Sequence, residues 1–281
     1  MTKGNAFVTG ASRGIGKAIA IELGEAGYDV AITSRTLHEG ESREHSSTLK
    51  RSDTSPLPGS LDETAELVRA TGQRCLVVPA DLLDHPTLVT AADTVVEQWG
   101  PVDVLVNNAR YIGPGHMDLI LDTPVRILRD HLEANILAGV VLIKTLVPRM
   151  IEKGGGTVIN ITSGAAYGDP PAAAGKGGWG LGYGASKGAF HRVAGILALE
   201  TADQGIRAFN VQPGFIATER IQQDMGSFGF DASLGAPAAV VGKVCRWLLE
   251  SPDADALNGQ NIEAQELCSE LDLLPGWSLA S

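Results

Sequence analysis

Tyr183 and Lys187 are four residues apart in a segment with helical spacing, so both side chains project from the same face of one helix. A tyrosine exchanges a proton near neutral pH only if its pKa falls from about 10 to about 7, which requires roughly 4 kcal/mol. A lysine ammonium about 4 Å away supplies a similar amount at an effective dielectric constant near 20. The pair therefore predicts acid–base chemistry on an oxygen atom, as in reduction of a carbonyl or oxidation of an alcohol. Its alternative is a simple surface contact between the two side chains.

A serine provides the third part of this candidate site. Ser163 follows the apolar run 157–161, which predicts a buried strand, and ligands of open α/β sheets bind at the carboxyl ends of the strands. We expect its hydroxyl to hold the substrate oxygen. Thr162 is the alternative for this role, although neighbouring side chains on a strand point to opposite faces.

A glycine-rich turn near the start of the chain predicts a phosphate-binding site. The sequence TGASRGIG at 9–16 follows the apolar run 5–8 and opens a segment with helical spacing. In this context glycines let backbone N–H groups approach a pyrophosphate at the N-terminus of the helix. The alternative is an ordinary glycine-rich turn without a ligand.

The surrounding pattern places these motifs in one α/β domain. Continuous apolar runs alternate with helical segments, which indicates a parallel sheet buried on both faces. We expect a doubly wound parallel sheet, Rossmann-like, with residues 1–281 in a single dinucleotide-binding catalytic domain. The expected strands are 5–8, 30–32, 75–78, 104–106, 157–161 and 207–211, and the expected helices are 15–26, 61–70, 87–99, a long one ending near Met150, 183–201 and 236–249.

With TGxxxGxG at 9–16, NNA at 107–109 and YxxxK at 183–187, the chain resembles the short-chain dehydrogenase/reductase family from about Asn5 to Ile262. The resemblance implies that Ser163 binds the substrate oxygen, Tyr183 transfers the proton, and Lys187 lowers the tyrosine pKa and holds the nicotinamide ribose. It also implies that Asn135 holds a proton-relay water. The cofactor-binding residues that it implies are Gly10, Ser12, Ile15, Asp81, Asn108, Tyr183, Lys187, Pro213, Gly214, Ile216 and Thr218.

Several of these matches have plain structural alternatives. Asp81 is implied to contact adenine and Thr218 the nicotinamide carboxamide, but either side chain is also a favoured helix cap. Asn135 is an ordinary residue for a helix surface when taken alone. Asn107 is implied to bond across the central strands, which is mainly a structural role.

The end of the second strand favours NADP(H) over NAD(H). An NAD site in this fold carries an acid there that bonds the ribose hydroxyls, whereas a 2′-phosphate requires a cation. Ser34 stands in the position of the acid, Arg35 follows it, and Arg13 in the glycine turn is expected to face the same corner. One arginine–phosphate bond, worth about 1.5–3 kcal/mol, changes the preference roughly ten- to a hundredfold. The alternative is that Arg35 is only a solvated strand-end residue.

Some segments depart from the pattern of the family. The polar segment 38–60 is expected to be a surface loop, and segment 164–182 a cleft wall in which Tyr167 and Trp179 either cover an apolar substrate or pack within the loop. Residues 215–234 are expected to form the opposite wall and a candidate lid. Arg110, where the family has glycine, binds an acidic substrate group, points to solvent or joins a local ion pair. The tail of about 265–281 lacks the customary glycine pair before it and has no assigned role.

Composition limits the partners and the location. A formal net charge of −11 disfavours nucleic acid and anionic membranes. The three cysteines, Cys75, Cys245 and Cys268, form no metal-ligand cluster and are expected to be reduced and buried. No charged leader precedes the first strand and no apolar run approaches 18 residues, so we expect a cytoplasmic protein. The family resemblance implies a homotetramer or homodimer.

The leading hypothesis is an NADP(H)-dependent oxidoreductase that transfers a hydride between the nicotinamide and a carbonyl or secondary alcohol. A non-catalytic dinucleotide-binding regulator is the alternative, and the complete set of Ser163, Tyr183 and Lys187 argues against it. A sugar-nucleotide epimerase or dehydratase shares the motifs but adds a C-terminal substrate domain, for which fewer than about twenty residues remain after Ile262. A zinc alcohol dehydrogenase is disfavoured because the ligand cluster is missing.

Overall fold

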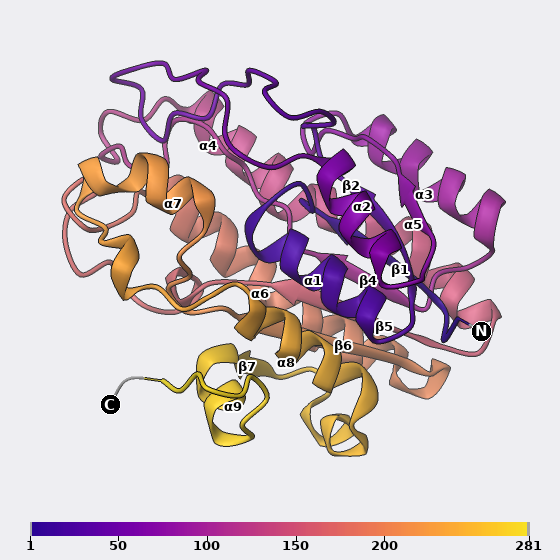
Figure 1. Cartoon of the computed structure of the whole chain (residues 1–281). Coiled ribbons are helices and arrows are strands. Elements are labelled where there is room, and N and C mark those ends of the chain that lie inside the picture. Colours follow the sequence, from indigo (N-terminus) through magenta and orange to yellow (C-terminus); the bar gives the residue numbers. More distant parts are fainter. Residues whose placement is uncertain (1, 280–281) are drawn as a thin grey trace.

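The computed structural model describes residues 2–279, and in this part seven parallel strands form one sheet in the order β3-β2-β1-β4-β5-β6-β7 (Figure 1). Almost all residues of β1, β2 and β4 are buried, as expected for strands covered on both faces. The strands are β1 Asn5–Thr9, β2 Asp29–Thr33, β3 Cys75–Val77, β4 Val104–Asn107, β5 Gly156–Ile161, β6 Ile206–Gln212 and β7 Asn261–Glu263.

Helices cover both faces of this sheet. One core cluster packs α1, α2 and α8 on one face, and a second packs α3, α5 and α6 on the other. The doubly wound single domain is therefore confirmed, and the observed ends lie within a few residues of the expected ones. The helices are α1 Gly14–Glu25, α2 Leu61–Ala70, α3 His85–Trp99, α4 Val125–Leu132, α5 Ala138–Glu152, α6 Leu181–Thr201, α7 Glu219–Asp224, α8 Ala239–Glu250 and α9 Ala264–Glu270.

The expected long helix is interrupted by one π-helical turn, Glu133–Leu137, between α4 and α5. The stretch Val125–Glu152 is apolar and long enough to cross a membrane by length and composition, but half of its most apolar window is buried inside the protein. Its apolar residues, such as Leu142 and Leu146, pack in the core against α3 and the sheet. The stretch is therefore a core helix of this fold.

The prediction that segment 38–60 is a surface loop is wrong for its middle part. His45, Ser46, Ser47 and Thr48 are at most 5% exposed. The Thr48 hydroxyl donates to the Asp118 carboxylate at 2.6 Å, and the side chains of the other polar residues are also hydrogen-bonded. A polar segment can be buried when its groups find such partners. Figure 1 shows the insertion crossing the top of the molecule.

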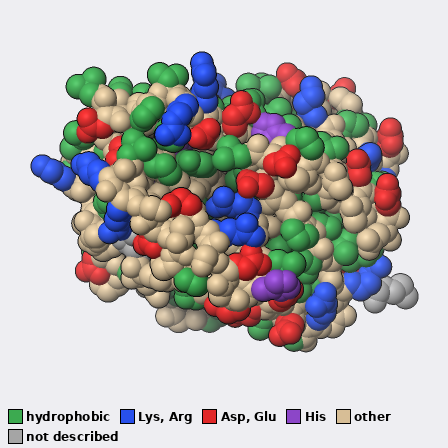
Figure 2. Space-filling view, turned by 90° about the horizontal axis from the view of Figure 1, so that it is seen from above, with side chains coloured by type: hydrophobic (Ala, Val, Ile, Leu, Met, Phe, Trp, Pro, Cys, Tyr) green, Lys and Arg blue, Asp and Glu red, His purple; other side chains and the backbone are tan. Residues whose placement is uncertain are grey.

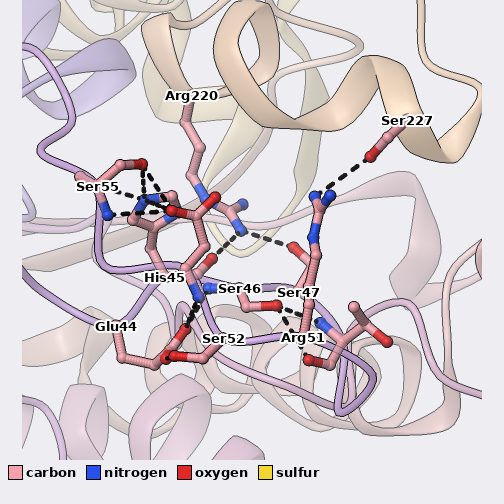
Figure 3. Close-up of polar contacts among 11 residues, drawn as sticks. Glu44, His45, Ser46, Ser47, Arg51, Ser52, Ser55, Arg220 and Ser227 are labelled. Carbon is pink, nitrogen blue, oxygen red and sulfur yellow. Dashed lines mark hydrogen bonds and ion pairs between the residues drawn. The ribbon is translucent and has the colours of Figure 1, made fainter.

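The insertion is fastened to the segment that follows β6. Arg220 of α7 donates to the carbonyl of His45 at 3.0 Å and to the Ser47 hydroxyl at 2.7 Å (Figure 3). Arg51 donates to the Ser227 hydroxyl at 3.3 Å and lies over the ring of Phe228. The insertion and the 215–234 segment thus form one continuous cover beside the carboxyl edge of the sheet.

The C-terminal tail packs on its own chain. α9 begins directly after β7, where the family pattern has the glycine pair, and it contacts α8. Cys268 is fully buried, and Leu273 and Trp277 pack against the core cluster of α1 and α8. All three cysteines are free and buried, as expected.

Candidate active site

The turn between β1 and α1 has no room for a side chain at Gly10 or Gly16. Gly10 has a φ of +66°, and a Cβ atom on Gly16 would lie 2.2 Å from the carbonyl oxygen of Gly10. The Asn108 amide, at the end of β4, donates to the carbonyls of Thr9 and Gly10 at 2.8 and 3.2 Å. This close approach leaves the backbone exposed to the cleft, which is the arrangement that a pyrophosphate requires.

The N-terminus of α1 already binds an anionic oxygen. The N–H of Gly14, the first residue of α1, donates to Oε2 of Glu219 at 2.9 Å. Unpaired N–H groups and the helix dipole favour negative charge at this position. The cradle therefore fits an anionic group, and Glu219 was not among the residues predicted from the sequence.

The two predicted phosphate-binding arginines line the same cleft but have different partners. Arg35 lies with Nη1 4.0 Å from the Asp81 carboxylate, and both side chains are more than a third exposed. Arg13 instead donates to three backbone carbonyls of the insertion, those of Leu57, Pro58 and Gly59. Burial and, more weakly, Arg35 lower the pKa of Arg13. The Nε and Nη2 donors of Arg13 are thus used by the insertion, and the expectation that both guanidinium groups face a 2′-phosphate remains a prediction.

Tyr183 and Lys187 line the same cleft as the glycine turn. Both lie in the first two turns of α6, and the Lys187 ammonium donates to the carbonyl of Ile161 at 2.8 Å. Burial, reinforced by the nearby Arg110 guanidinium, lowers the pKa of Lys187 to about 7. A lysine that is charged at this depth gains strongly from a neighbouring anion, such as a phenolate.

Ser163 lies at the end of β5, as predicted, but Thr162 rather than Ser163 is among the residues that line the cleft. The Ser163 hydroxyl accepts a hydrogen bond from the N–H of Ala165 at 3.2 Å and caps a short 3₁₀ turn. Its own O–H can still donate. The Thr162 hydroxyl is buried and has no hydrogen-bond partner among the described residues.

The two asparagines of the central elements are buried. Asn107 donates to Oδ1 of Asn160 at 3.0 Å, which confirms the expected bond between β4 and β5. Asn135 lies in the π-helical turn and is 3% exposed, so it is not a surface residue. Its amide accepts from the N–H of Tyr111 at 2.5 Å and donates to the Ser186 hydroxyl at 2.8 Å. The asparagine thereby connects the loop after β4 to α6.

The turn after β6 is held by a residue that the sequence patterns did not indicate. Pro213 and Thr218 line the cleft, whereas Gly214 and Ile216 do not. The Gln265 amide donates to the carbonyls of Pro213 and Phe215, both at 3.1 Å. A Cβ atom on Gly214, whose φ is +72°, would lie 2.2 Å from that amide. Gln265 of α9 thus fills the space behind Gly214, and the cofactor contacts implied for Gly214 and Ile216 remain predictions.

A family model described as short chain dehydrogenase matches residues 4–57 and 54–225. The chain belongs to the short-chain dehydrogenase/reductase family. It is 29% identical over 263 residues to the uncharacterized oxidoreductase YhdF of Bacillus subtilis, across 92% of this chain and 80% of that protein. It is 30% identical over 220 residues to the 3-oxoacyl-(acyl-carrier-protein) reductase FabG of Staphylococcus aureus, across 78% and 76%. The crystal structure of acetoin dehydrogenase YohF from Salmonella typhimurium has a TM-score of 0.72 at 26% identity and covers 94% of both chains.

Two basic residues, Arg110 and His116, lie beside the ring of Tyr183. Arg110 lines the cleft, with Cζ 5.7 Å from the centre of the Tyr183 ring. His116, which no sequence pattern indicated, is buried with its ring 4.3 Å from that of Tyr183. Burial lowers the pKa of His116 well below its ordinary value, and Arg110 and Arg220 lower it further. His116 is therefore neutral at pH 7.

The extended segment 164–182 contributes little aromatic surface to the cleft. The Tyr167 hydroxyl donates to Glu263 on β7, and its ring lies near that of His191. Trp179 packs beside Gly184 in the first turn of α6. Neither aromatic residue lines the cleft; Trp179 packs within the protein, and Tyr167 lies at the surface, 56% exposed.

We predict that Gly16→Ala destabilises the protein by about 1–3 kcal/mol and abolishes cofactor binding, because the added methyl group overlaps the carbonyl of Gly10. Urea unfolding and calorimetric titration with NADPH measure the two effects. Gly226→Ala is the matched control, since its Cβ atom meets nothing within 4 Å. Normal binding by Gly16→Ala would show that the turn relaxes around the methyl group.

A second prediction concerns His131, which is buried, donates to the carbonyl of Pro114 and packs against Tyr111. Burial lowers its pKa to about 4. The His131 imidazole takes up a proton near pH 6.5 in the unfolded chain but only near pH 4 in the folded chain. The contribution of neutral His131 to the free energy of unfolding is therefore present above pH 6.5 and is lost as the pH falls to 4. His131→Gln should remove up to about 3 kcal/mol of this loss. Unfolding curves at pH 8 and pH 4.5 measure it, and equal losses in both proteins would refute the prediction.

Proposed function

We propose that this protein is an NADP(H)-dependent oxidoreductase that interconverts a carbonyl compound and the corresponding secondary alcohol. The observation that carries the proposal is that Tyr183 and Lys187 share one cleft with the glycine turn of β1 and α1. One half of the cleft has the shape and N–H groups for a dinucleotide, and the other half has a proton donor beside a buried cation.

The adenosine end of the cleft supports NADP(H). Arg35 follows β2 directly, and no carboxylate takes the place of Ser34, whose hydroxyl accepts from the N–H of Thr36. A 2′-phosphate there would gain from the guanidinium and meet no repelling acid at that position. Arg35 is the main support for this preference, because the Nε and Nη2 donors of Arg13 are used by the insertion.

The residues of the chain would act as follows. Nicotinamide, when bound, supplies or accepts the hydride. Ser163 donates its O–H to the substrate oxygen, and Tyr183 gives its proton to that oxygen during reduction and takes it back during oxidation. Lys187 stabilises the resulting phenolate by its charge. Asn135 keeps α6 and the loop after β4 in register through Ser186 and Tyr111. The relay water that the family resemblance implies for Asn135 remains part of this proposal.

We also propose a cytoplasmic homo-oligomer. Apolar side chains on the outer surfaces of the helices support an interface between subunits: Ile196 and Leu199 of α6 are 50% and 88% exposed, and Leu137 before α5 is 41% exposed. Exposed apolar groups that lie close together are typical of contact surfaces.

Tyr183→Phe should bind NADPH within about twofold of the wild type and lose most turnover, by roughly a hundredfold or more, because the proton donor is removed. Calorimetry with NADPH and a screen of carbonyl substrates measure the two quantities. Tyr28→Phe is the matched control, as Tyr28 lies in the turn between α1 and β2. Unchanged turnover in Tyr183→Phe would overturn the mechanism.

Arg35→Asp should change the ratio of the NADPH and NADH dissociation constants by about ten- to a hundredfold in favour of NADH. The new carboxylate repels a 2′-phosphate and can bond ribose hydroxyls. The same substitution at the exposed Arg129 of α4 controls for a general change in charge. If the ratio stays the same, Arg35 does not select the cofactor.

A further inference from the structure

The cleft is basic although the chain is acidic. Among the described residues that line it there are five cationic side chains and one carboxylate, whereas the whole chain has a formal net charge of −11. Figure 2 shows Lys and Arg side chains gathered near the middle of the face seen from above. The five cationic residues are Arg13, Arg35, Arg110, Lys187 and Arg220, and the carboxylate is that of Asp81.

Four of these five cations form two groups, and the fifth, Arg220, donates to His45 and Ser47 of the insertion. Arg13, Arg35 and Asp81 lie around the glycine turn and the end of β2, where the phosphates of a dinucleotide would neutralise the excess. Arg110 and Lys187 lie at the other end with Tyr183. The positive charge at the tyrosine end is therefore not needed to hold the adenosine phosphates.

Arg110 is the cation with capacity to bind a further anion. Its guanidinium donates to the carbonyl of Tyr111 at 3.0 Å, and within residues 2–279 it forms no ion pair. A guanidinium carries five N–H donors, so most of its hydrogen-bonding capacity remains. Burial lowers its pKa, which shows that the cleft solvates this charge less well than water does.

The surroundings of Arg110 hold other positive or neutral groups. Four neighbours lower the pKa of the buried His116 through their charges: Arg110, Arg220, His131 and Lys187. Each of them therefore disfavours a further positive charge at this place. The main causes of the pKa changes of Arg110, His116 and Lys187 include no carboxylate of the described residues. An anion at this end of the cleft would relieve the repulsion among these groups.

Resting on the proposed oxidoreductase function, we propose that Arg110 binds a carboxylate of the substrate, so that the enzyme acts on oxo acids and hydroxy acids in preference to neutral carbonyl compounds. A planar guanidinium matches the two oxygens of a carboxylate. Cζ of Arg110 lies 5.7 Å from the centre of the Tyr183 ring, which places the carboxylate a few bonds from the reacting carbonyl. In the reduction NADPH gives a hydride to the carbonyl carbon and Tyr183 gives a proton to its oxygen, and the carboxylate is unchanged.

The same guanidinium chemistry would also suit a phosphate of the cofactor. The position of Arg110 beside Tyr183, rather than beside Gly14 and Arg35, favours the substrate as the source of the anion. The two sources predict different results when Arg110 is changed. If Arg110 binds a substrate carboxylate, its substitution weakens the binding of acidic substrates only. If Arg110 binds a cofactor phosphate, its substitution weakens the binding of NADPH.

The first measurement is binding, which does not require turnover. Pyruvate, acetoacetate, 4-oxopentanoate and their methyl esters are titrated into the NADP⁺-saturated protein by calorimetry. We expect at least one acid to bind ten times or more tightly than its ester, and Arg110→Gln to remove this difference. Arg110→Lys should restore part of it, since the charge returns without the planar fork. Arg126→Gln, at an exposed arginine of α4, is the control for net charge.

The second measurement is kcat/KM with NADPH for the same compounds. Arg110→Gln should lower kcat/KM for the preferred acid about ten- to a hundredfold and change that of its ester, and the dissociation constant of NADPH, by less than about threefold. The inference is overturned if no acid binds more tightly than its ester, if acid and ester are affected equally, or if NADPH binding weakens instead. Tight, Arg110-dependent acid binding without turnover would uphold the anion site and refute the proposed reaction.

Discussion

The parallel pairing of β1 with β4 and of β4 with β5 is the constraint on which the site depends. In a parallel sheet all carboxyl ends lie on one edge, so the segments that leave β1, β4, β5 and β6 meet there. The register places Val8 beside Val106 and Asn107 beside Asn160. One residue further on, Asn108 reaches back to the carbonyls of Thr9 and Gly10 and shapes the glycine turn. A change of register by one residue would point these side chains to the other face.

The chemistry at this edge depends on burial as much as on the choice of residues. Lys187 is held 4% exposed under the end of β5, and burial together with Arg110 lowers its pKa to about 7. The same exclusion of water strengthens every charge interaction in the cleft. An anionic ligand in the cleft is therefore stabilised more strongly than it would be at the surface of this acidic protein.

The insertion between β2 and α2 adds a cover that the core of the fold does not require. Arg13 holds its far end through backbone carbonyls, and Arg220 holds its middle through His45 and Ser47. These contacts connect the adenosine side of the cleft to the segment after β6, where Glu219 also reaches the N-terminus of α1. The glycine turn, the insertion and the segment after β6 are thus connected by hydrogen bonds.

The sequence by itself determined the fold class, the parallel sheet and most of its strands and helices, although not β7, α7 and α9, because continuous apolar runs and helical spacing are local properties of the chain. It also indicated that Tyr183 and Lys187 share a site with the glycine turn. The order of the motifs, and their positions after predicted strands, can be recognised in the sequence alone. The tertiary structure alone decided the partners of Arg13, the burial of His45 to Thr48, the clamp of Gln265 on the turn after β6, and the position of His116 against Tyr183. These depend on hydrogen bonds and packing between segments far apart in the chain, for which the residue types involved carry no local periodicity or spacing.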